Sequence, residues 1–226
     1  MSLKSFPGLI LAIVTLGIGA VFLPLSSTHP GVESFPDPAV DTDRSITKGK
    51  RTAVFAGGCF WCVEAVFEQL AGVERVVSGY AGGKPEMAHY DLVSSGKTDH
   101  AESVRITFDP SKISYGQLLK VFFSVAHDPT QLNRQGPDYG RQYRSAIFCS
   151  EQEQKPIAEA YIRQLQQAKI FSKPIVTEVS ELKGFYPAEE YHQDFVKRNS
   201  THPYVVANAL PKLEKTRKAF PSLLKK

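Results

Sequence analysis

Residues 52–70 have the sequence TAVFAGGCFWCVEAVFEQL. The first five residues form a short apolar run, which predicts a buried β-strand. From Val63 to Leu70 the apolar residues recur three or four positions apart, which predicts a helix with one buried face. A glycine pair and two cysteines lie between these two runs. We therefore expect Cys59 at the point where the chain leaves a strand and enters a helix.

This position makes Cys59 the first candidate for a reactive residue. The N-terminus of a helix has unpaired N–H groups and the positive end of the helix dipole, and both favour thiolate over thiol. The thiolate is the nucleophilic form of cysteine. Cys62 follows three residues later, so redox chemistry between the two thiols is also available.

The composition indicates an ordinary globular protein. The chain has 226 residues, of which 42% are hydrophobic and 22% charged, and this predicts one domain with extensions. The net charge of +4 is mild and no basic run alternates with aromatic residues, so we expect no nucleic-acid partner. Three cysteines are too few for a disulfide framework, and no second Cys or His pair completes a zinc site. We expect no metal and no cofactor.

The two ends of the chain differ from its middle. Residues 6–25 have almost no polar groups, which predicts a signal peptide or an uncleaved signal-anchor over 1–25. Residues 26–50 contain prolines and acidic residues without periodicity, which is typical of a flexible linker. We expect the catalytic domain at 51–203, outside the cytoplasm in a periplasm or an equivalent space, and attached to a membrane if the anchor is retained. Residues 204–226 form a basic extension, and we expect a monomer.

The domain alternates between strand and helix patterns. Strands are predicted at 52–56, 73–80, 101–108, 143–149 and 175–179. Helices are predicted at 62–70, 118–125 and 151–169, with Ser114 as an N-cap and a helical turn at 89–94. The pattern indicates an α+β fold, in which a two-layer mixed sheet carries helices on one face (a ferredoxin-like core). A long irregular C-terminal segment follows from residue 182.

Short motifs occur along the domain in a specific order. They are GCFW at 58–61, GYAGG at 79–83, Tyr90, HAESV at 100–104, HDP at 127–129, DYGRQYRS at 138–145, FYPAE at 185–189 and YHQ at 191–193. In this order they resemble peptide methionine sulfoxide reductases of the A type, and the resemblance covers 51–203. It implies reduction of methionine sulfoxide, free or in proteins and as the S epimer, with thioredoxin or a similar protein as the reductant.

The resemblance also assigns roles to individual residues. Reduction of a sulfoxide needs a thiolate that attacks the sulfur, a proton donor for the oxygen and a pocket for the methyl group. The matching residues are Cys59 as the nucleophile that becomes a sulfenic acid, Glu102 as the acid, Tyr90 and Tyr143 as donors to the sulfoxide oxygen, Phe60 and Trp61 as walls for the methyl group, and Asp138 as an orienting residue. Glu102 must be buried to keep a proton near neutral pH.

The chain departs from the family pattern in how the sulfenic acid is resolved. Many relatives place recycling cysteines in the C-terminal tail, but residues 150–226 contain none. We expect Cys62 to attack the Cys59 sulfenic acid and close an intramolecular disulfide. Cys149 and direct reduction by an external thiol remain alternatives. Two other functions also remain open at this point, a thiol–disulfide oxidoreductase and an exported adaptor without enzyme activity.

Overall fold

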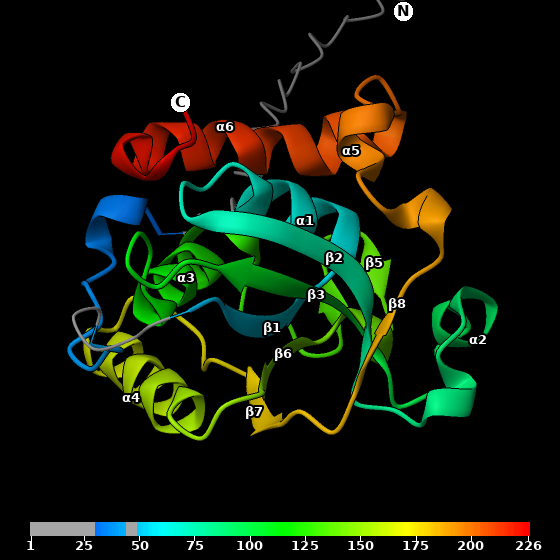
Figure 1. The fold of residues 1–226 in the computed structure, drawn as a ribbon, viewed down its shortest axis with the longest axis horizontal. Helices are drawn as coiled ribbons and strands as arrows, with labels where there is room; N and C mark the ends of the chain where they lie inside the picture. Colours follow the sequence, from blue (N-terminus) through cyan, green and yellow to red (C-terminus); the bar gives the residue numbers. More distant parts are fainter. Residues whose placement is uncertain (1–29, 44–48) are drawn as a thin grey trace, which may run out of the picture.

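The structure is a computed structural model that describes residues 30–43 and 49–226. Its centre is a six-stranded sheet in the order β7-β6-β1-β3-β2-β8 (Figure 1). The strands are β1 (Arg51–Gly57), β2 (Val73–Ala81), β3 (Ala101–Phe108), β6 (Ser145–Cys149), β7 (Glu178–Glu181) and β8 (Phe185–Pro187). Only β6 and β7 pair in parallel, and all other neighbours are antiparallel. The sheet is therefore mixed, as predicted.

The helices connect and cover these strands. They are α1 (Phe60–Glu68), α2 (Tyr90–Ser94), α3 (Tyr115–Val121), α4 (Gln154–Gln167), α5 (Phe195–Arg198) and α6 (Leu210–Ala219). A π-helical turn, Phe122–Ala126, extends α3, and a second one, Val205–Ala209, precedes α6. The chain order β1-α1-β2-β3-α3-β6 and the spatial order β6-β1-β3-β2 are those of a ferredoxin-like core. The predicted fold class is confirmed.

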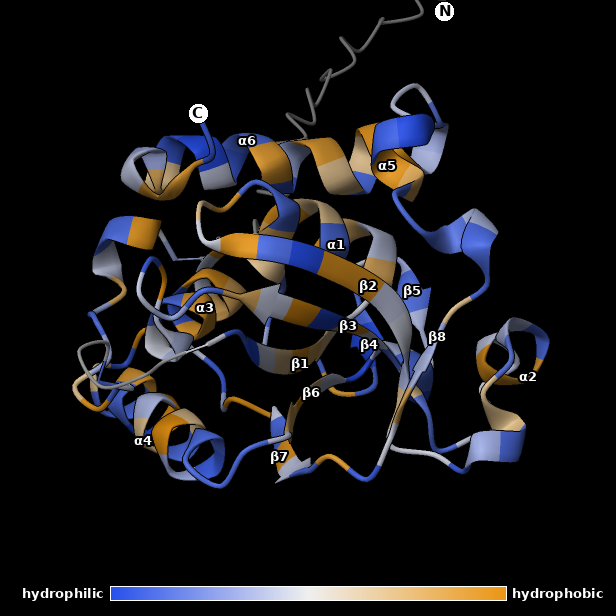
Figure 2. Cartoon of the chain, viewed as in Figure 1, coloured by the Kyte–Doolittle hydropathy of each residue, from blue (hydrophilic) through white to orange (hydrophobic). Residues whose placement is uncertain are grey.

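The two faces of the sheet carry side chains of different size. Successive residues of a strand point to opposite faces, so Phe55 joins the large core under α1 and α3, whereas Ala56 faces the other way. The large core also contains Ile106 and Tyr80, while the second face is formed mostly by alanines around Phe148. Figure 2 shows apolar residues concentrated on the central strands and on the helices that lie against them. Helices therefore cover one face, as the sequence predicts.

Local signals in the sequence place most element ends correctly. Ser114 caps α3, because its Oγ accepts from the Gln117 amide at 3.1 Å and its own amide donates to Gln117 Oε1 at 3.1 Å. The helix predicted at 62–70 begins earlier, at Phe60, and the strand predicted at 175–179 lies at Glu178–Glu181. The segment from 182 is more regular than expected, since it contains β8 and α6.

The N-terminal part of the chain is described only from residue 30. The segment predicted as a signal peptide or anchor, 1–25, lies outside the described residues. Within 30–43 and 49–226, none of the helices combines the length and the apolar character needed to cross a membrane.

Residues 30–43 pack against the domain, although the sequence predicts a flexible linker there. Phe35 is buried against Phe171, and the Tyr161 hydroxyl donates to the carbonyl of Pro36 at 3.0 Å. Asp41 accepts from the Gly116 amide at 2.7 Å, at the start of α3. These contacts make 30–43 part of the folded domain and not a free spacer.

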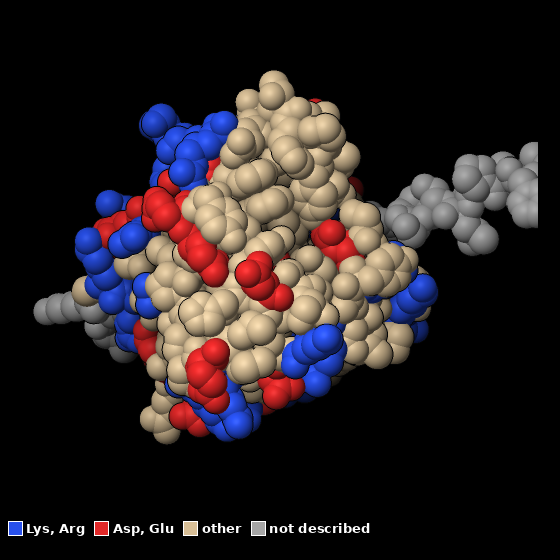
Figure 3. Space-filling view, turned by 90° about the vertical axis from the view of Figure 1, so that its right-hand side faces the viewer, with Lys and Arg blue, Asp and Glu red and all other residues tan. Residues whose placement is uncertain are grey.

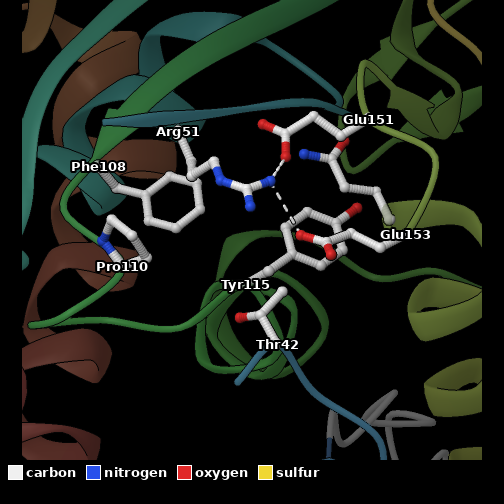
Figure 4. Close-up of a pocket in the computed structure, with 8 residues that line it drawn as sticks. Thr42, Arg51, Phe108, Pro110, Tyr115, Glu151 and Glu153 are labelled. Atoms are coloured by element: carbon white, nitrogen blue, oxygen red, sulfur yellow. Dashed lines mark hydrogen bonds and ion pairs between the residues drawn. The ribbon is translucent and has the colours of Figure 1, made fainter. Parts of the chain in front are cut away.

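The segment ends beside an ion-pair cluster at the edge of the sheet. Figure 4 shows Thr42 near Arg51, whose guanidinium pairs with Glu151 and, at 2.9 Å, with Glu153. The cavity at this point has a volume of about 10 Å³. It is too small to hold a substrate, and it lies at the start of β1, whereas Cys59 follows the end of that strand.

The C-terminal part also belongs to the domain. The boundary predicted at residue 203 falls inside the fold, because α6 packs along α1 and Leu224 bridges to Leu70. Val205 and Thr216 are both fully buried. The segment predicted as a basic extension therefore shields the helix that begins at the cysteine pair.

Candidate active site

Cys59 is the N-cap of α1 and follows β1 by two residues. The turn between them requires Gly58, whose φ is +89°. A Cβ atom at Gly58 would lie 2.5 Å from the Cβ of Gln135, so a larger residue does not fit. The sequence prediction of a strand–turn–helix junction at Cys59 is confirmed, and the junction leaves this cysteine largely buried, with 8% of its surface exposed.

The thiols of Cys59 and Cys62 are hydrogen-bonded to each other. Burial raises the pKa of Cys59 well above its usual range, and the bond to Cys62 raises it further. The same bond, donated by Cys59, lowers the pKa of Cys62. The two thiols therefore titrate as a unit, and burial favours the thiol form of Cys59. The sequence argument from the helix dipole, which favours a thiolate at Cys59, does not hold for the substrate-free structure.

Glu102 of β3 lies directly beside Cys59. Its Oε2 accepts a hydrogen bond of 3.0 Å from the amide of Phe60, the residue after Cys59. The side chain is buried, with 3% exposed, and this burial raises its pKa to about 8. Glu102 consequently carries a proton at neutral pH, which is the condition that the sequence argument sets for an acid.

Tyr90 and Tyr143 face the same site from two other elements. Tyr90 is the first residue of α2, and Tyr143 ends the 3-10 turn Arg141–Tyr143. Burial raises the pKa of both phenols, and the charges of Glu102 and Cys59 raise them further. Both hydroxyls therefore stay protonated and can donate hydrogen bonds at neutral pH.

Phe60 and Trp61 occupy different depths. Phe60 is 1% exposed and packs on Tyr80, with ring centroids 5.9 Å apart. Trp61 is half-buried and stacks on Phe195 at 3.7 Å, with 8° between the rings, while its Nε1 donates to His192 Nδ1 at 3.1 Å. Trp61 is therefore the aromatic wall open to a ligand, and Phe60 supports the site from the core.

Asp138 lies in the hairpin formed by β4 (Arg134–Gln135) and β5 (Asp138–Tyr139). Its Oδ2 accepts from the Tyr204 hydroxyl at 2.5 Å, and burial raises its pKa. Tyr204 also lines the pocket that holds Cys59 and Cys62. Asp138 thus reaches the thiols through a tyrosine that the sequence analysis missed.

Comparison with known proteins shows what this site is. The family model described as peptide methionine sulfoxide reductase matches residues 51–223. The chain belongs to this family. The peptide methionine sulfoxide reductase MsrA 2 of Synechocystis sp. is 56% identical over 198 residues, which cover 87% of this chain and 92% of that protein. The MsrA 2 of Mesorhizobium japonicum is also 56% identical, over 80% of this chain and 93% of that protein.

A solved structure agrees with the sequence comparisons. Methionine sulfoxide reductase A of Corynebacterium diphtheriae superposes with a TM-score of 0.60 at 33% identity, over 71% of this chain and 80% of that one. The protein is thus an enzyme that reduces methionine sulfoxide in a thiol-dependent reaction. Membership of the family sets aside the two other functions left open by the sequence, the thiol–disulfide oxidoreductase and the adaptor.

The histidines in the family motifs hold the reductase together around the site. His100 accepts from the Gly83 amide at 3.2 Å, and its Nε2 lies 2.9 Å from the carbonyl of Lys84. His127 bonds the carbonyl of Phe122 at 3.0 Å and the Ser145 hydroxyl at 2.7 Å. Both rings therefore fix loops and not a ligand. Within 30–43 and 49–226, no three His, Cys, Asp or Glu residues are grouped in a way that could hold a metal ion.

The face of the reductase that carries α2 and α5 has both uncharged and charged areas. Figure 3 shows an area without charged side chains in the upper part of this face, while acidic side chains lie across its middle and basic ones toward its edges. Tyr191 is next to His192, which accepts the hydrogen bond from Trp61, and its side chain is 58% exposed.

Proposed function

We propose that the reductase acts on the S epimer of methionine sulfoxide, free or in proteins, with Cys59 as the nucleophile and Glu102 as the acid. The observation that carries this proposal is the bond between Glu102 Oε2 and the amide next to Cys59, made by a carboxyl whose pKa is about 8. A protonated acid is thereby held beside the attacking sulfur.

In the first step, Cys59 Sγ attacks the sulfoxide sulfur while Glu102 gives its proton to the oxygen. Tyr90 and Tyr143 donate hydrogen bonds to that oxygen, and Trp61 contacts the methyl group. The S–O bond of the substrate breaks, and the released oxygen, now carrying the proton from Glu102, attacks Cys59 Sγ. The bond between Cys59 Sγ and the substrate sulfur breaks in this attack, and methionine leaves. Cys59 becomes a sulfenic acid, and its former thiol proton restores the acid form of Glu102, so protons and electrons balance.

In the second step, Cys62 resolves the sulfenic acid. Its thiol already contacts Cys59 in the reduced protein. Cys149 is too distant for this role, because Phe148 pairs with Val54, three residues before the end of β1. Three residues of strand span roughly 10 Å, more than a disulfide bridges. Burial also raises the pKa of Cys149 to about 11, whereas the hydrogen bond from Cys59 lowers the pKa of Cys62.

We further propose that thioredoxin or a thioredoxin-like protein reduces the disulfide, and that the enzyme acts as a monomer outside the cytoplasm. The location rests on the apolar segment 1–25. A donor in that space must receive its electrons across the membrane. Fractionation of cells that express the full chain, with sequencing of the mature N-terminus, tests whether the segment anchors the enzyme or is removed.

Single-turnover chemistry tests the assignments. The reduced enzyme receives one equivalent of each sulfoxide epimer without reductant, and methionine and thiol modifications are measured by mass spectrometry. We expect methionine only from the S epimer, a Cys59–Cys62 disulfide, and no methionine from Cys59→Ser. Cys149→Ser is the matched control and retains the full yield. A persistent sulfenic acid or a Cys59–Cys149 link contradicts the role of Cys62.

A further inference from the structure

We infer that Lys212 and Tyr204, from the C-terminal segment, prepare Cys62 for its attack on the Cys59 sulfenic acid. This inference rests on the proposed function, in which Cys62 is the resolving cysteine. Lys212 acts through its charge and Tyr204 through its hydroxyl, so both are positioning residues. The segment that carries cysteines in many relatives here supplies a cation and a phenol instead.

Lys212, Tyr204 and the two thiols share one pocket of about 60 Å³. The pocket is lined by Cys59, Cys62, Gln135, Gly136, Pro137, Asp138, Tyr204, Asn208 and Lys212. Lys212 lies in the first turn of α6, and its Nζ donates to the carbonyl of Ala126 at 2.7 Å. This bond ties α6 to the π turn after α3 and fixes the ammonium near Cys62.

The charges around Cys62 favour its thiolate on balance. The hydrogen bond from Cys59 is the largest influence that lowers the pKa of Cys62, and the charge of Lys212 lowers it further, whereas burial and the charge of Asp138 raise it. Glu102 is the remaining acid in range, and it is protonated at neutral pH. Once Cys59 has become a sulfenic acid, the bond from its thiol is gone. Lys212 is then the one cation that the described site offers to a Cys62 thiolate.

Tyr204 gives the proton of Cys62 a path. Its hydroxyl donates to Asp138 Oδ2 at 2.5 Å and lines the same pocket as the Cys62 thiol. A proton can therefore leave Cys62 for the Tyr204 oxygen while the Tyr204 proton moves to Asp138. Burial raises the pKa of Asp138, which makes this carboxylate a better proton acceptor than an exposed one.

The resolving step then balances without a further reactant. The Cys62 thiolate attacks Cys59 Sγ, the S–S bond forms and the S–O bond of the sulfenic acid breaks. The hydroxide that leaves takes back the proton held by Asp138, and water is the product. Cys59 is reduced from sulfenic acid to disulfide sulfur, and Cys62 is oxidised from thiol to disulfide sulfur.

The test compares Lys212→Met with Lys215→Met by rapid quench. Lys215 is a matched control, because it lies on the same helix and its Nζ donates to a carbonyl of the same π turn, that of Ser124 at 2.8 Å, but it does not line the pocket. Each reduced variant receives one equivalent of methionine sulfoxide, and the rates of methionine and disulfide formation are measured from pH 6 to 9.5.

We expect Lys212→Met to slow disulfide formation relative to methionine formation by about threefold to tenfold at pH 7. A pKa one unit higher lowers the thiolate fraction about tenfold, while the more basic thiolate gains about threefold in nucleophilicity. Above the pKa of Cys62, the rate of disulfide formation in Lys212→Met should equal that of the wild type. Lys212→Arg, which keeps the positive charge, should form the disulfide at the wild-type rate. Tyr204→Phe should also slow the disulfide step, and Lys215→Met should match the wild type.

Two results would overturn the inference. One is a wild-type rate and pH profile for the disulfide step in Lys212→Met. The other is an equal loss in both lysine variants at every pH, which would show that α6 has only a structural role. A wild-type enzyme that forms methionine but no Cys59–Cys62 disulfide would refute the proposed role of Cys62 itself, and the inference with it.

Discussion

Replacement of Glu102 by glutamine separates proton transfer from the rest of the site. The amide has almost the shape of the carboxylic acid, and its oxygen can still accept from the Phe60 amide that Glu102 contacts at 3.0 Å. It cannot give up a proton. With a pKa of about 8, Glu102 holds its proton in roughly nine of ten molecules at pH 7. A positioned acid contributes about 10²- to 10⁴-fold to such a step, so we expect methionine formation to fall at least 100-fold.

The assay is methionine formation in a single turnover, followed from pH 6 to 9.5. In the wild type the rate should fall as pH rises through about 8, because Glu102 loses its proton there. Glu102→Gln should be slow throughout and lack this decline. Glu64→Gln is the matched control, since burial also raises the pKa of Glu64 to about 8 but this residue faces Ser78 and Asp194 and not the thiols. A rate within tenfold of the wild type in Glu102→Gln, or an unchanged decline, would refute the role of the acid.

Three further predictions concern stability and recycling. Folding raises the pKa of Glu64 to about 8, so the wild type loses stability as pH rises toward 8 and the folded protein gives up this proton. The free energy of unfolding of Glu64→Gln in urea should therefore exceed that of the wild type by an amount that grows by about 1.4 kcal/mol per pH unit between pH 5 and 8. Cys62→Ser should still form methionine once and keep the sulfenic acid. It should lose turnover with thioredoxin but retain turnover with dithiothreitol, and a thioredoxin-dependent turnover equal to that of the wild type would contradict this. Phe35→Ala should lower the free energy of unfolding by about 3 kcal/mol, because it empties the buried contact with Phe171, and an unchanged urea midpoint would show that 30–43 is not part of the fold.

The sequence predicts the elements whose signals are local. The apolar periodicity around Cys59 and the cap at Ser114 depend on residues within one or two turns, and both predictions match the structure. β8 has no such signal, because it has only three residues, ends in Pro187 and gains its strand character from pairing with β2. Phe35 is buried by residues more than a hundred positions away, which a window of sequence does not contain.

The residues of the site also divide into those that local sequence motifs predict and those that only distant contacts bring there. The family motifs place Glu102 and Asp138 near Cys59, and the structure brings these residues together. Tyr204 and Lys212 lie outside those motifs, on a segment with a basic composition that is typical of a solvated tail. They reach the thiols only because α6 packs along α1, a contact between residues about 150 positions apart. A tyrosine or a lysine alone has no pattern from which this role can be predicted.

The protonation state of Cys59 depends on which of two opposing effects is larger, the helix dipole or burial. A helix N-terminus stabilises a negative charge by about 0.3–1 kcal/mol, and by at most about 2 kcal/mol. Burial of a charged group shifts a pKa by up to about 3–5 units, each of which corresponds to about 1.4 kcal/mol. Cys59 is almost fully buried, so the second effect is larger and its pKa rises. The dipole argument holds for an exposed cysteine and not for this one.

Because burial keeps the Cys59 thiol protonated in the empty site, its proton must be removed after the substrate binds. At rest, Cys59 and Glu102 both hold protons, so neither a Cys59 thiolate nor a Glu102 carboxylate is present before substrate binds. Attack on the sulfoxide needs a thiolate and an acid together, and the oxygen of the bound substrate is the group that can take a proton from Glu102. The Glu102 carboxylate left behind can then accept the proton of Cys59 as the S–S contact forms. In this scheme a Cys59 thiolate forms only while a sulfoxide is bound.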